Sequence, residues 1–461
     1  MLILRLRRTP RAAIWTVPPG TTKVAFVAAV LLVGALPLAD PAVADYSKPQ
    51  VKALLRSALH KHELKPTEIS ACHQKAHGRW RCTWKATGNE DGVAFDCEGS
   101  AKFNARTRTW KGTKCVEPMV PLLSSPGPHP AWGYNEDWER FSGDTLDLAA
   151  AGGSDIARVY LKWGWIEGEP DKYGWTHHDR LLGDMYSRGI RPLLVLSQPP
   201  CWATPETCQS PPFQGPLPPP GPPPPDVCSA EAPTPDALDD AAEVAALAAQ
   251  RYPFALGIEV WNEPNLKRFW CPAPDPELYS ALVGEVAQAV HAANSAMPVI
   301  AAGLAPQTND NADGMGYENF LRRAYAAGGL QLADAIGVHP YPFVPYHADY
   351  LGTIRKQLYR YLRVMSEFGD AAKPIWVTEV GVPEGDGYTL DQQADALVRI
   401  YTLFRRIANI PVLVYHRLID YDGAGGYPET ERYGVISQSG QLKPAYCAMA
   451  AVREMPTPPL C

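Results

Sequence analysis

The sequence lacks several features that mark other classes of protein. None of its ten cysteines forms a Cys-x-x-Cys pair, and His73 and His77 supply no second pair of ligands, so the usual spacing of a structural zinc site is absent. No glycine-rich phosphate loop follows the first apolar segment of the main domain, which argues against a doubly wound nucleotide-binding fold. The formal net charge of −6 is mild for 461 residues and does not favour a nucleic-acid partner for the whole chain. We therefore expect neither a metal ion nor a cofactor.

The apolar run near the start of the chain is short. It covers residues 24–38, is interrupted by Pro37, and falls below the roughly 20 residues that a membrane span needs. Basic residues precede it, at Arg5, Arg7, Arg8, Arg11 and Lys23. Because the small residues 42–44 follow it, we predict that residues 1–44 are a secretory signal cleaved after Ala44 and that the protein is secreted. The alternative is an uncleaved membrane anchor.

All ten cysteines lie beyond this segment, and an even number in an exported chain favours disulfides. Four of them, Cys72, Cys82, Cys97 and Cys115, fall in residues 45–117. Apolar residues with helical spacing come first there, and strand-like runs follow at 79–87, 93–103 and 107–115. We predict a small α+β module held by two disulfides, with all three pairings open.

The predicted module is rich in Lys and Arg, and Trp80, Trp84 and Trp110 are interleaved with the basic residues. One interpretation is a surface that contacts the cell wall or an anionic polymer, guided by charge. The other is a solvated face with the tryptophans in the core. A proline-rich segment, residues 118–130, predicts an extended linker after the module.

From residue 131 to residue 461 apolar strands alternate with helical patterns, which predicts parallel βα units and a (β/α)8 TIM barrel. The fourth strand begins near Phe254 and stops at Asn262. The other seven predicted strands lie at 131–135, 156–163, 191–200, 297–306, 333–343, 374–381 and 410–420.

Two glutamates stand at the ends of predicted strands. Glu263 follows the fourth strand, and Glu379 ends the seventh. In a parallel α/β barrel the side chains at the carboxyl ends of the strands converge on the catalytic rim. Glycosidases use a pair of carboxyl groups to cleave the glycosidic bond, so this pair predicts a glycosidase.

The local sequence around these residues resembles that of clan-A retaining glycoside hydrolases. The resemblance is greatest to family 39, and family 5 is the next nearest. The stretch WNEPNL, 261–266, followed by Phe269 and Trp270, carries the resemblance. It implies that Glu263 is the general acid/base and Glu379 the nucleophile. It also implies that Asn262 contacts the sugar 2-hydroxyl, that Arg158 bonds the nucleophile, and that His339 and Tyr341 lie near it. For Arg158 the alternative is a buried ion pair with Glu259.

Strand eight departs from the pattern of the clan, which often has a tryptophan platform there. This chain has Tyr415 and His416, and Tyr415 is the candidate platform. Tryptophans at the starts of loops are candidate walls of sugar subsites, although each could equally be core: Trp163, Trp165, Trp202 and Trp270.

Six further cysteines lie in the predicted barrel. The proline-rich loop 201–228 carries Cys201, Cys208 and Cys228, and a bridge from one of them to Cys271 would join two rim loops. Cys447 and Cys461 would join the C-terminal tail to the last helix.

The sequence therefore predicts an exported retaining glycoside hydrolase that acts on β-linked oligo- or polysaccharides by double displacement. Two alternatives remain: a carbohydrate-binding protein that has lost activity on a hydrolase fold, or a transglycosylase that uses the same residues.

Overall fold

The computed structural model describes residues 46–61, 64–76, 78–90, 93–111, 119–136, 143–205, 231–385, 387–421, 432–456, 458 and 461. The predicted signal segment and its cleavage site near Ala44 lie outside these residues. Of the helices in the described ranges, none is both long enough and apolar enough to cross a membrane.

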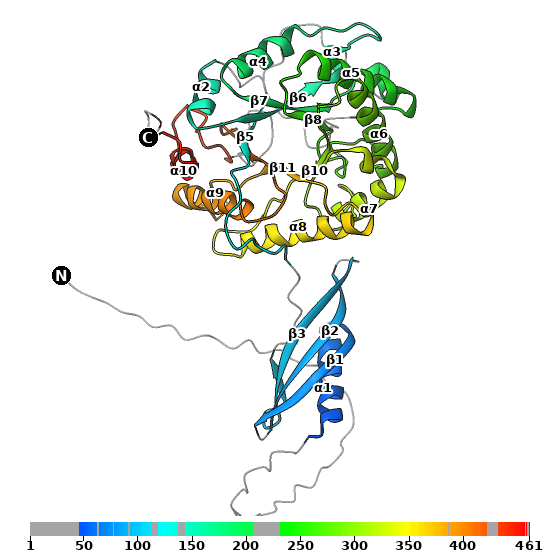
Figure 1. The fold of residues 1–461 in the computed structure, drawn as a ribbon, viewed down its shortest axis with the longest axis vertical. Coiled ribbons are helices and arrows are strands. Elements are labelled where there is room, and N and C mark those ends of the chain that lie inside the picture. The colour runs from blue at the N-terminus through cyan, green and yellow to red at the C-terminus, as the bar shows by residue number, and fades with distance from the viewer. Residues whose placement is uncertain are drawn as a thin grey trace, which may run out of the picture.

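The N-terminal unit is one helix on an antiparallel sheet, as predicted (Figure 1). Its elements are α1 (Lys48–His60), β1 (Lys65–Ala76), β2 (Arg79–Glu90), β3 (Val93–Asn104) and β4 (Thr109–Lys111), and the strands pair in that order. The sequence patterns did not reveal β1. Its register shifts at three places, which interrupts the alternation of apolar and polar residues by which strands are recognised.

The core of this unit lies between α1 and one face of the sheet. Val51, Leu55 and Leu59 of α1 are fully buried, and Trp80 and Trp84 are buried with them. These two tryptophans are therefore core residues; Trp110 is half-buried and packs on Phe103. A disulfide joins Cys72 to Cys82, whereas Cys115 and the side chain of Cys97 lie outside the description.

The second unit is a closed barrel of eight parallel strands, which confirms the predicted fold (Figure 1). Its strands are β5 (Ala131–Asn135), β6 (Ile156–Lys162), β7 (Arg191–Ser197), β8 (Gly257–Val260), β9 (Val299–Leu304), β10 (Ala335–Val338), β11 (Ile375–Val380) and β12 (Val412–His416). Its α-helices are α2 (Gly143–Ala151), α3 (Trp163–Ile166), α4 (Thr176–Ser187), α5 (Leu238–Arg251), α6 (Pro276–Ala293), α7 (Tyr317–Ala327), α8 (Tyr350–Glu367), α9 (Leu390–Phe404) and α10 (Pro444–Val452). Short 3-10 turns cover Cys201–Ala203, Pro235–Ala237 and Gly329–Leu332.

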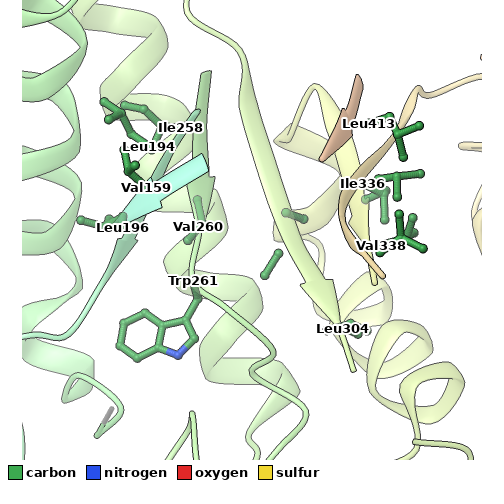
Figure 2. Packing of buried hydrophobic residues seen from close by; sticks show 14 of the residues in the cluster. Val159, Leu194, Leu196, Ile258, Val260, Trp261, Leu304, Ile336, Val338 and Leu413 are labelled. Atoms are coloured by element: carbon green, nitrogen blue, oxygen red, sulfur yellow. The ribbon is translucent and has the colours of Figure 1, made fainter. Parts of the chain in front are cut away.

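Successive side chains along each barrel strand pack into two different layers, one between the strands and the helices and one inside the barrel. Leu194 and Leu196 of β7 and Ile258 and Val260 of β8 belong to the large cluster that includes the helices (Figure 2). Their neighbour Leu193 belongs to a separate cluster to which strands all around the barrel contribute, and which forms the floor of the barrel interior. Because the pleat has a period of two, the next inward positions along these strands lie above that floor. Those positions carry the polar residues of the site.

The predicted linker is part of the barrel surface over its described residues, 119–130. Val120 is buried, and the backbone oxygens of residues 120, 123 and 127 each accept two bonds from an arginine of α8 or of the turn after α9. The arginines are Arg355, Arg405 and Arg406. We call residues 119–130 the strap.

Candidate active site

Glu263 stands on a sharply bent backbone directly after β8. Both Trp261 (φ 79°) and Glu263 (φ 44°) have left-handed backbone conformations, which cost free energy in residues other than glycine. Local bonds hold the bend: the Glu263 amide donates to the carbonyl of Gly303 at 3.1 Å. The buried Asn265 side chain bonds the backbone of Ala305 in both directions, at 2.9 and 3.0 Å. The loop thus holds the Glu263 carboxylate in a defined place at the top of β8.

Glu379 is held by donors on both of its oxygens. Its Oε1 accepts from Arg158 Nη1 at 2.6 Å and from Asn135 Nδ2 at 2.9 Å. Its Oε2 accepts from the Tyr341 hydroxyl at 2.9 Å. These three donors come from β5, β6 and the loop after β10, so the closed barrel is what brings them together.

The same contacts decide the charge of Glu379. Burial by itself raises the pKa of a carboxylic acid, but the electrostatic effects of His339, Arg158 and His416 and the bond from Tyr341 outweigh burial. Together they lower the pKa of Glu379 to about 2. Burial and the charge of Glu379 raise the pKa of Tyr341 well above its usual value, so its hydroxyl remains a donor. Glu379 is therefore an anion at neutral pH, as a nucleophile must be.

Arg158 is fully buried and bonds both of its proposed partners. Its Nε donates to Glu259 Oε2 at 2.6 Å, its Nη1 to Glu379, and its Nη2 to Asn262 Oδ1 at 2.9 Å. Burial of the guanidinium disfavours its charge, but the two carboxylates outweigh this and raise the pKa of Arg158 further. The two interpretations of Arg158 are therefore compatible in one geometry. The Asn262 amide nitrogen has no partner among the described residues and can donate to a sugar hydroxyl.

A chain of hydrogen bonds determines where the protons of His339 lie. Thr378 donates its single hydroxyl proton to Glu259 Oε1 at 2.8 Å, so its oxygen must accept the proton of His339 Nε2, 3.1 Å away. The other ring nitrogen, Nδ1, faces Glu263 Oε1 at 2.9 Å. If His339 is neutral, Nδ1 carries no proton and Glu263 must supply the one in this contact. Either way, the Glu263 and His339 pair holds one proton beyond the Nε2–H.

Glycine at position 303 makes this chain of bonds possible. Its amide donates to Glu259 Oε1 at 3.0 Å. A Cβ at this position would lie 2.1 Å from the His339 ring and 2.7 Å from the Thr378 hydroxyl. A side chain here would therefore displace the histidine from Glu263.

The two catalytic candidates lie close together. One carboxylate oxygen of Glu263, one ring nitrogen of His339 and one carboxylate oxygen of Glu379 all lie within 4.8 Å of one another. Retaining glycosidases separate their carboxyl groups by about 5–5.5 Å, and inverting ones by about 6.5–9.5 Å. Three such groups could also attract a cation, but the Arg158 guanidinium, 2.6 Å from Glu379, would repel one. The spacing fits the retaining arrangement.

Six of the residues singled out from sequence converge here: Arg158, Asn262, Glu263, His339, Tyr341 and Glu379. Tyr415 does not, which corrects its expected role as a platform. It is fully buried, packs beside Trp132 and Tyr134, and exchanges bonds with the backbone of Val382. Because successive residues of a strand face opposite sides, its neighbour His416 is the one that bonds Asn135, at 3.1 Å.

Two of the four tryptophans predicted as walls are core residues. Trp163 and Trp270 are buried at 0% and 1% exposure, so neither offers a ring face to a sugar. Trp202 is half-buried and packs edge to face against Trp163, with its indole nitrogen donating to the Glu167 carbonyl. Trp165 is half-buried as well, with the Lys162 ammonium 4.2 Å from its ring centroid, so Trp165 and Trp202 remain the candidate walls of the four. Cys201 beside it and Cys271 are both disulfide-bonded, whereas Cys208 and Cys228 lie outside the described residues, so the predicted bridge between rim loops stays a prediction. The predicted Cys447–Cys461 disulfide is present.

The sequence patterns missed three residues of the site. Asn135 ends β5 and Thr378 directly precedes Glu379, so a search for polar residues at strand ends could have found both. Phe343 could not be found in this way. Its ring is 70% exposed and lies parallel to that of Tyr341, with centroids 5.4 Å apart and an interplanar angle of 5°. An exposed phenyl ring stacked on Tyr341, which donates to Glu379, is a candidate sugar contact.

No protein-family model matches the chain, and no curated protein matches it in sequence. Solved structures do match. A family 39 glycoside hydrolase from the gut symbiont Bacteroides cellulosilyticus WH2 is 20% identical, with a TM-score of 0.52, covering 84% of this chain and 79% of that one. GH5_18 from Streptomyces cattleya in complex with GlcNAc is 19% identical, with a TM-score of 0.52, covering 72% of this chain and 83% of that one.

A third match is a GH5_18 protein from Bifidobacterium longum subsp. longum ATCC 55813 in complex with Manb1-4GlcNAc. It is 14% identical, with a TM-score of 0.52, and the match covers 71% of this chain and 78% of that one. The structural neighbours thus include both families that the sequence resembles, and the chain shares with them the (β/α)8 fold.

Proposed function

We propose that this protein is an exported retaining glycoside hydrolase acting on β-linked oligo- or polysaccharides. The observation that carries the proposal is the pair Glu263 and Glu379, which have oxygens within 4.8 Å of each other. Glu263 lies 2.9 Å from His339 Nδ1, and Glu379 accepts a hydrogen bond of 2.6 Å from Arg158. Glycosidase chemistry needs one protonated and one ionised carboxyl group at this spacing.

In the first step Glu379 attacks the anomeric carbon while Glu263 gives its proton to the glycosidic oxygen. The glycosidic bond breaks, the leaving sugar departs as an alcohol, and the remaining sugar is esterified to Glu379. In the second step Glu263 takes a proton from water, whose oxygen attacks the anomeric carbon and releases Glu379. Two inversions at one carbon retain its configuration.

The surroundings of the pair support a sugar substrate. The Asn262 amide can donate to the 2-hydroxyl, a contact that strengthens in the oxocarbenium-like transition state. Phe343 and Trp202 offer partly exposed rings at the rim. Two structural neighbours were solved with GlcNAc or Manb1-4GlcNAc bound, which makes β-linked sugars the first substrates to test. The disulfides support export, because such bonds persist in oxidising compartments.

The test uses the chain from Asp45 onward and a panel of activated aryl β-glycosides and common β-glycans. We expect Glu379→Ala to abolish turnover and Glu263→Ala to reduce it, with azide restoring the Glu263→Ala variant on an activated substrate. Azide is a nucleophile that needs no general base, so in Glu263→Ala it attacks the glycosyl-enzyme and gives a β-glycosyl azide. In Glu379→Ala azide could only take the place of the missing carboxylate, and the product would then be the α-glycosyl azide. Glu384→Ala, which alters a carboxylate outside the pair, is the control and should retain activity.

If glycans bind but no substrate turns over, the protein is a carbohydrate-binding protein on a hydrolase fold. If products appear mainly when acceptor sugars are added, it is a transglycosylase. Product analysis with and without an acceptor separates these outcomes from hydrolysis.

A further inference from the structure

Within the described residues of the N-terminal unit, only one face of the sheet is covered by a helix. Residues of β2 alternate strictly: Trp80, Cys82 and Trp84 are buried under α1, whereas Arg79, Arg81 and Thr83 are exposed on the other face. Ser100 and Lys102 of β3 and Thr109 and Lys111 of β4 are exposed as well. Figure 1 shows α1 beside the sheet on one side only.

Basic residues form a row across this face. Arg81 is paired with Lys102, and Lys102 with Lys111, on three adjacent strands; His73 of β1 lies opposite Arg81. Adjacent strands are about 4.8 Å apart, so the three charges lie within about one Debye length of each other. Arg79 lies two residues from Arg81 on the same face. We call Arg79, Arg81, Lys102 and Lys111 the basic row.

The charges of the basic row are not neutralised within the described part of the chain. None of its four members forms an ion pair with a residue in the described part of the chain. Like charges directly opposite each other on neighbouring strands destabilise a sheet. The same face also carries acidic positions farther along β2, where Lys85 stands opposite Glu68 and Glu98. The repulsion in the row is therefore a local feature, and it would be relieved by an anionic ligand.

Neutral polar groups flank the basic row on both sides. Ser70 and Thr83 share a hydrogen bond of 2.9 Å and continue to Ser100 on β3. On the other side, Asn104 lies opposite Arg79 and Thr109. Hydroxyl and amide groups beside cations suit a ligand that carries both hydroxyl and anionic groups. Among the described residues of this face the imidazole of His73 is the one exposed aromatic ring, and no Trp, Tyr or Phe is exposed there, so a row of stacking platforms for a single-stranded nucleic acid is absent.

We infer that this face binds an anionic polysaccharide, with the basic row contacting the carboxylates of successive uronic acid residues. A polymer fits the basic row because its carboxylates repeat along the polysaccharide chain as the basic side chains repeat across adjacent strands. The preference for a polysaccharide over other polyanions rests on the proposed function of the barrel, since tethering raises the effective concentration of a polymeric substrate. The binding itself does not depend on catalysis.

The test measures binding of the full mature chain to immobilised polygalacturonic acid, to its methyl-esterified form, which lacks the charge, and to double-stranded DNA. The Glu379→Ala variant is used throughout, so that hydrolysis cannot alter the result. We expect binding to the acid form that weakens as salt rises from about 0.05 to about 0.15 M, with at least about tenfold weaker binding to the methyl ester.

The variant Arg81→Glu/Lys102→Glu should lower affinity for the acid form at least about tenfold. Lys48→Glu/Arg56→Glu makes the same change in charge on the exposed side of α1 and should alter affinity by less than about twofold. Arg81→Gln/Lys102→Gln, which removes charge without reversing it, repeats the test if the first variant unfolds.

Three results would overturn the inference: no binding to the acid form, equal loss in the α1 variant, or binding to DNA that is tighter and depends on the same residues. The last would make this face a nucleic-acid surface. In the chain with native Glu379, turnover of small aryl glycosides should be the same with either basic-row variant. Loss of binding to the anionic polysaccharide and loss of turnover by the barrel are thus measured separately, so failure of one proposal can be told from failure of the other.

Discussion

The Tyr341 hydroxyl supplies one of the bonds that keep Glu379 ionised. Tyr341→Phe removes this bond to Oε2 and keeps the ring. A bond to the charged form lowers a carboxyl pKa, so its loss must raise the pKa of Glu379 from about 2. Since only the anion attacks, we expect the acidic limb of the pH profile of kcat/KM to move to higher pH by about one unit. The value of kcat/KM should fall about tenfold at pH values below this limb and much less at neutral pH, where Glu379 is an anion in both proteins.

The matched control is Tyr346→Phe. Its hydroxyl also donates to a carboxylate, Asp395, but outside the site. The pH profile of this control should match that of the unaltered protein. An unchanged acidic limb in Tyr341→Phe would contradict the role assigned to the hydroxyl.

Thr378 determines which nitrogen of His339 carries a proton. Thr378→Val keeps the shape of the side chain but removes the hydroxyl between His339 and Glu259. We expect kcat to fall about tenfold or more with a smaller change in KM, because Thr378 is fully buried and acts through His339. Thr378→Ser should restore most of the activity. If Thr378→Ser is as impaired as Thr378→Val, the hydroxyl has no such role.

The six site residues that converge could be predicted from the sequence for two reasons. They lie on or at the ends of predicted strands, and the local sequence resembles that of known glycoside hydrolases. The sequence did not predict which way an aromatic ring points. Tyr415 and His416 are neighbours on β12, and a shift of one residue in the pleat decides which of them reaches the site. Phe343 lies in a loop, where no periodicity predicts exposure.

At the scale of elements, the loop after β10 contributes both the Tyr341 hydroxyl, which donates to Glu379, and the exposed ring of Phe343. Phe343→Ala removes the ring beside Tyr341 without disturbing buried packing. We expect KM to rise about three- to tenfold with little change in kcat or in melting temperature. Tyr415→Phe, on β12, should leave KM unchanged. A higher KM in Tyr415→Phe together with an unchanged KM in Phe343→Ala would mean that the sugar contacts Tyr415 instead.

The strap is a second element whose role the composition did not reveal. Proline content predicted an extended segment, but could not predict the arginines of α8 and of the turn after α9 that bind its backbone. Val120→Asp puts a charge into a buried apolar site, and we expect it to lower the free energy of unfolding by about 2 kcal/mol or more. Urea denaturation measures this. Leu123→Ala, at a half-exposed position of the strap, should cost much less, and equal losses would contradict the packing of Val120.

At the scale of the whole molecule, the rhythm of strands and helices sufficed to predict the barrel and the helix-on-sheet unit. Each strand of the barrel buries both faces, so its apolar run is visible in the sequence. The bulges of β1 concealed that strand. The pairing of cysteines depends on distances in space, and the sequence left it open for the N-terminal unit, where Cys72 and Cys82 now form a pair.

The stereochemistry of the product tests the central claim most directly. With an active aryl β-glycoside or β-glycan, proton NMR of the first-formed product reports the configuration at the anomeric carbon before mutarotation. Carboxyl oxygens of Glu263 and Glu379 within 4.8 Å leave no room for a water molecule attacking from the opposite face, so the account predicts the β-anomer. An α-anomer as first product would mean direct displacement by water, and Glu379 would not be the nucleophile.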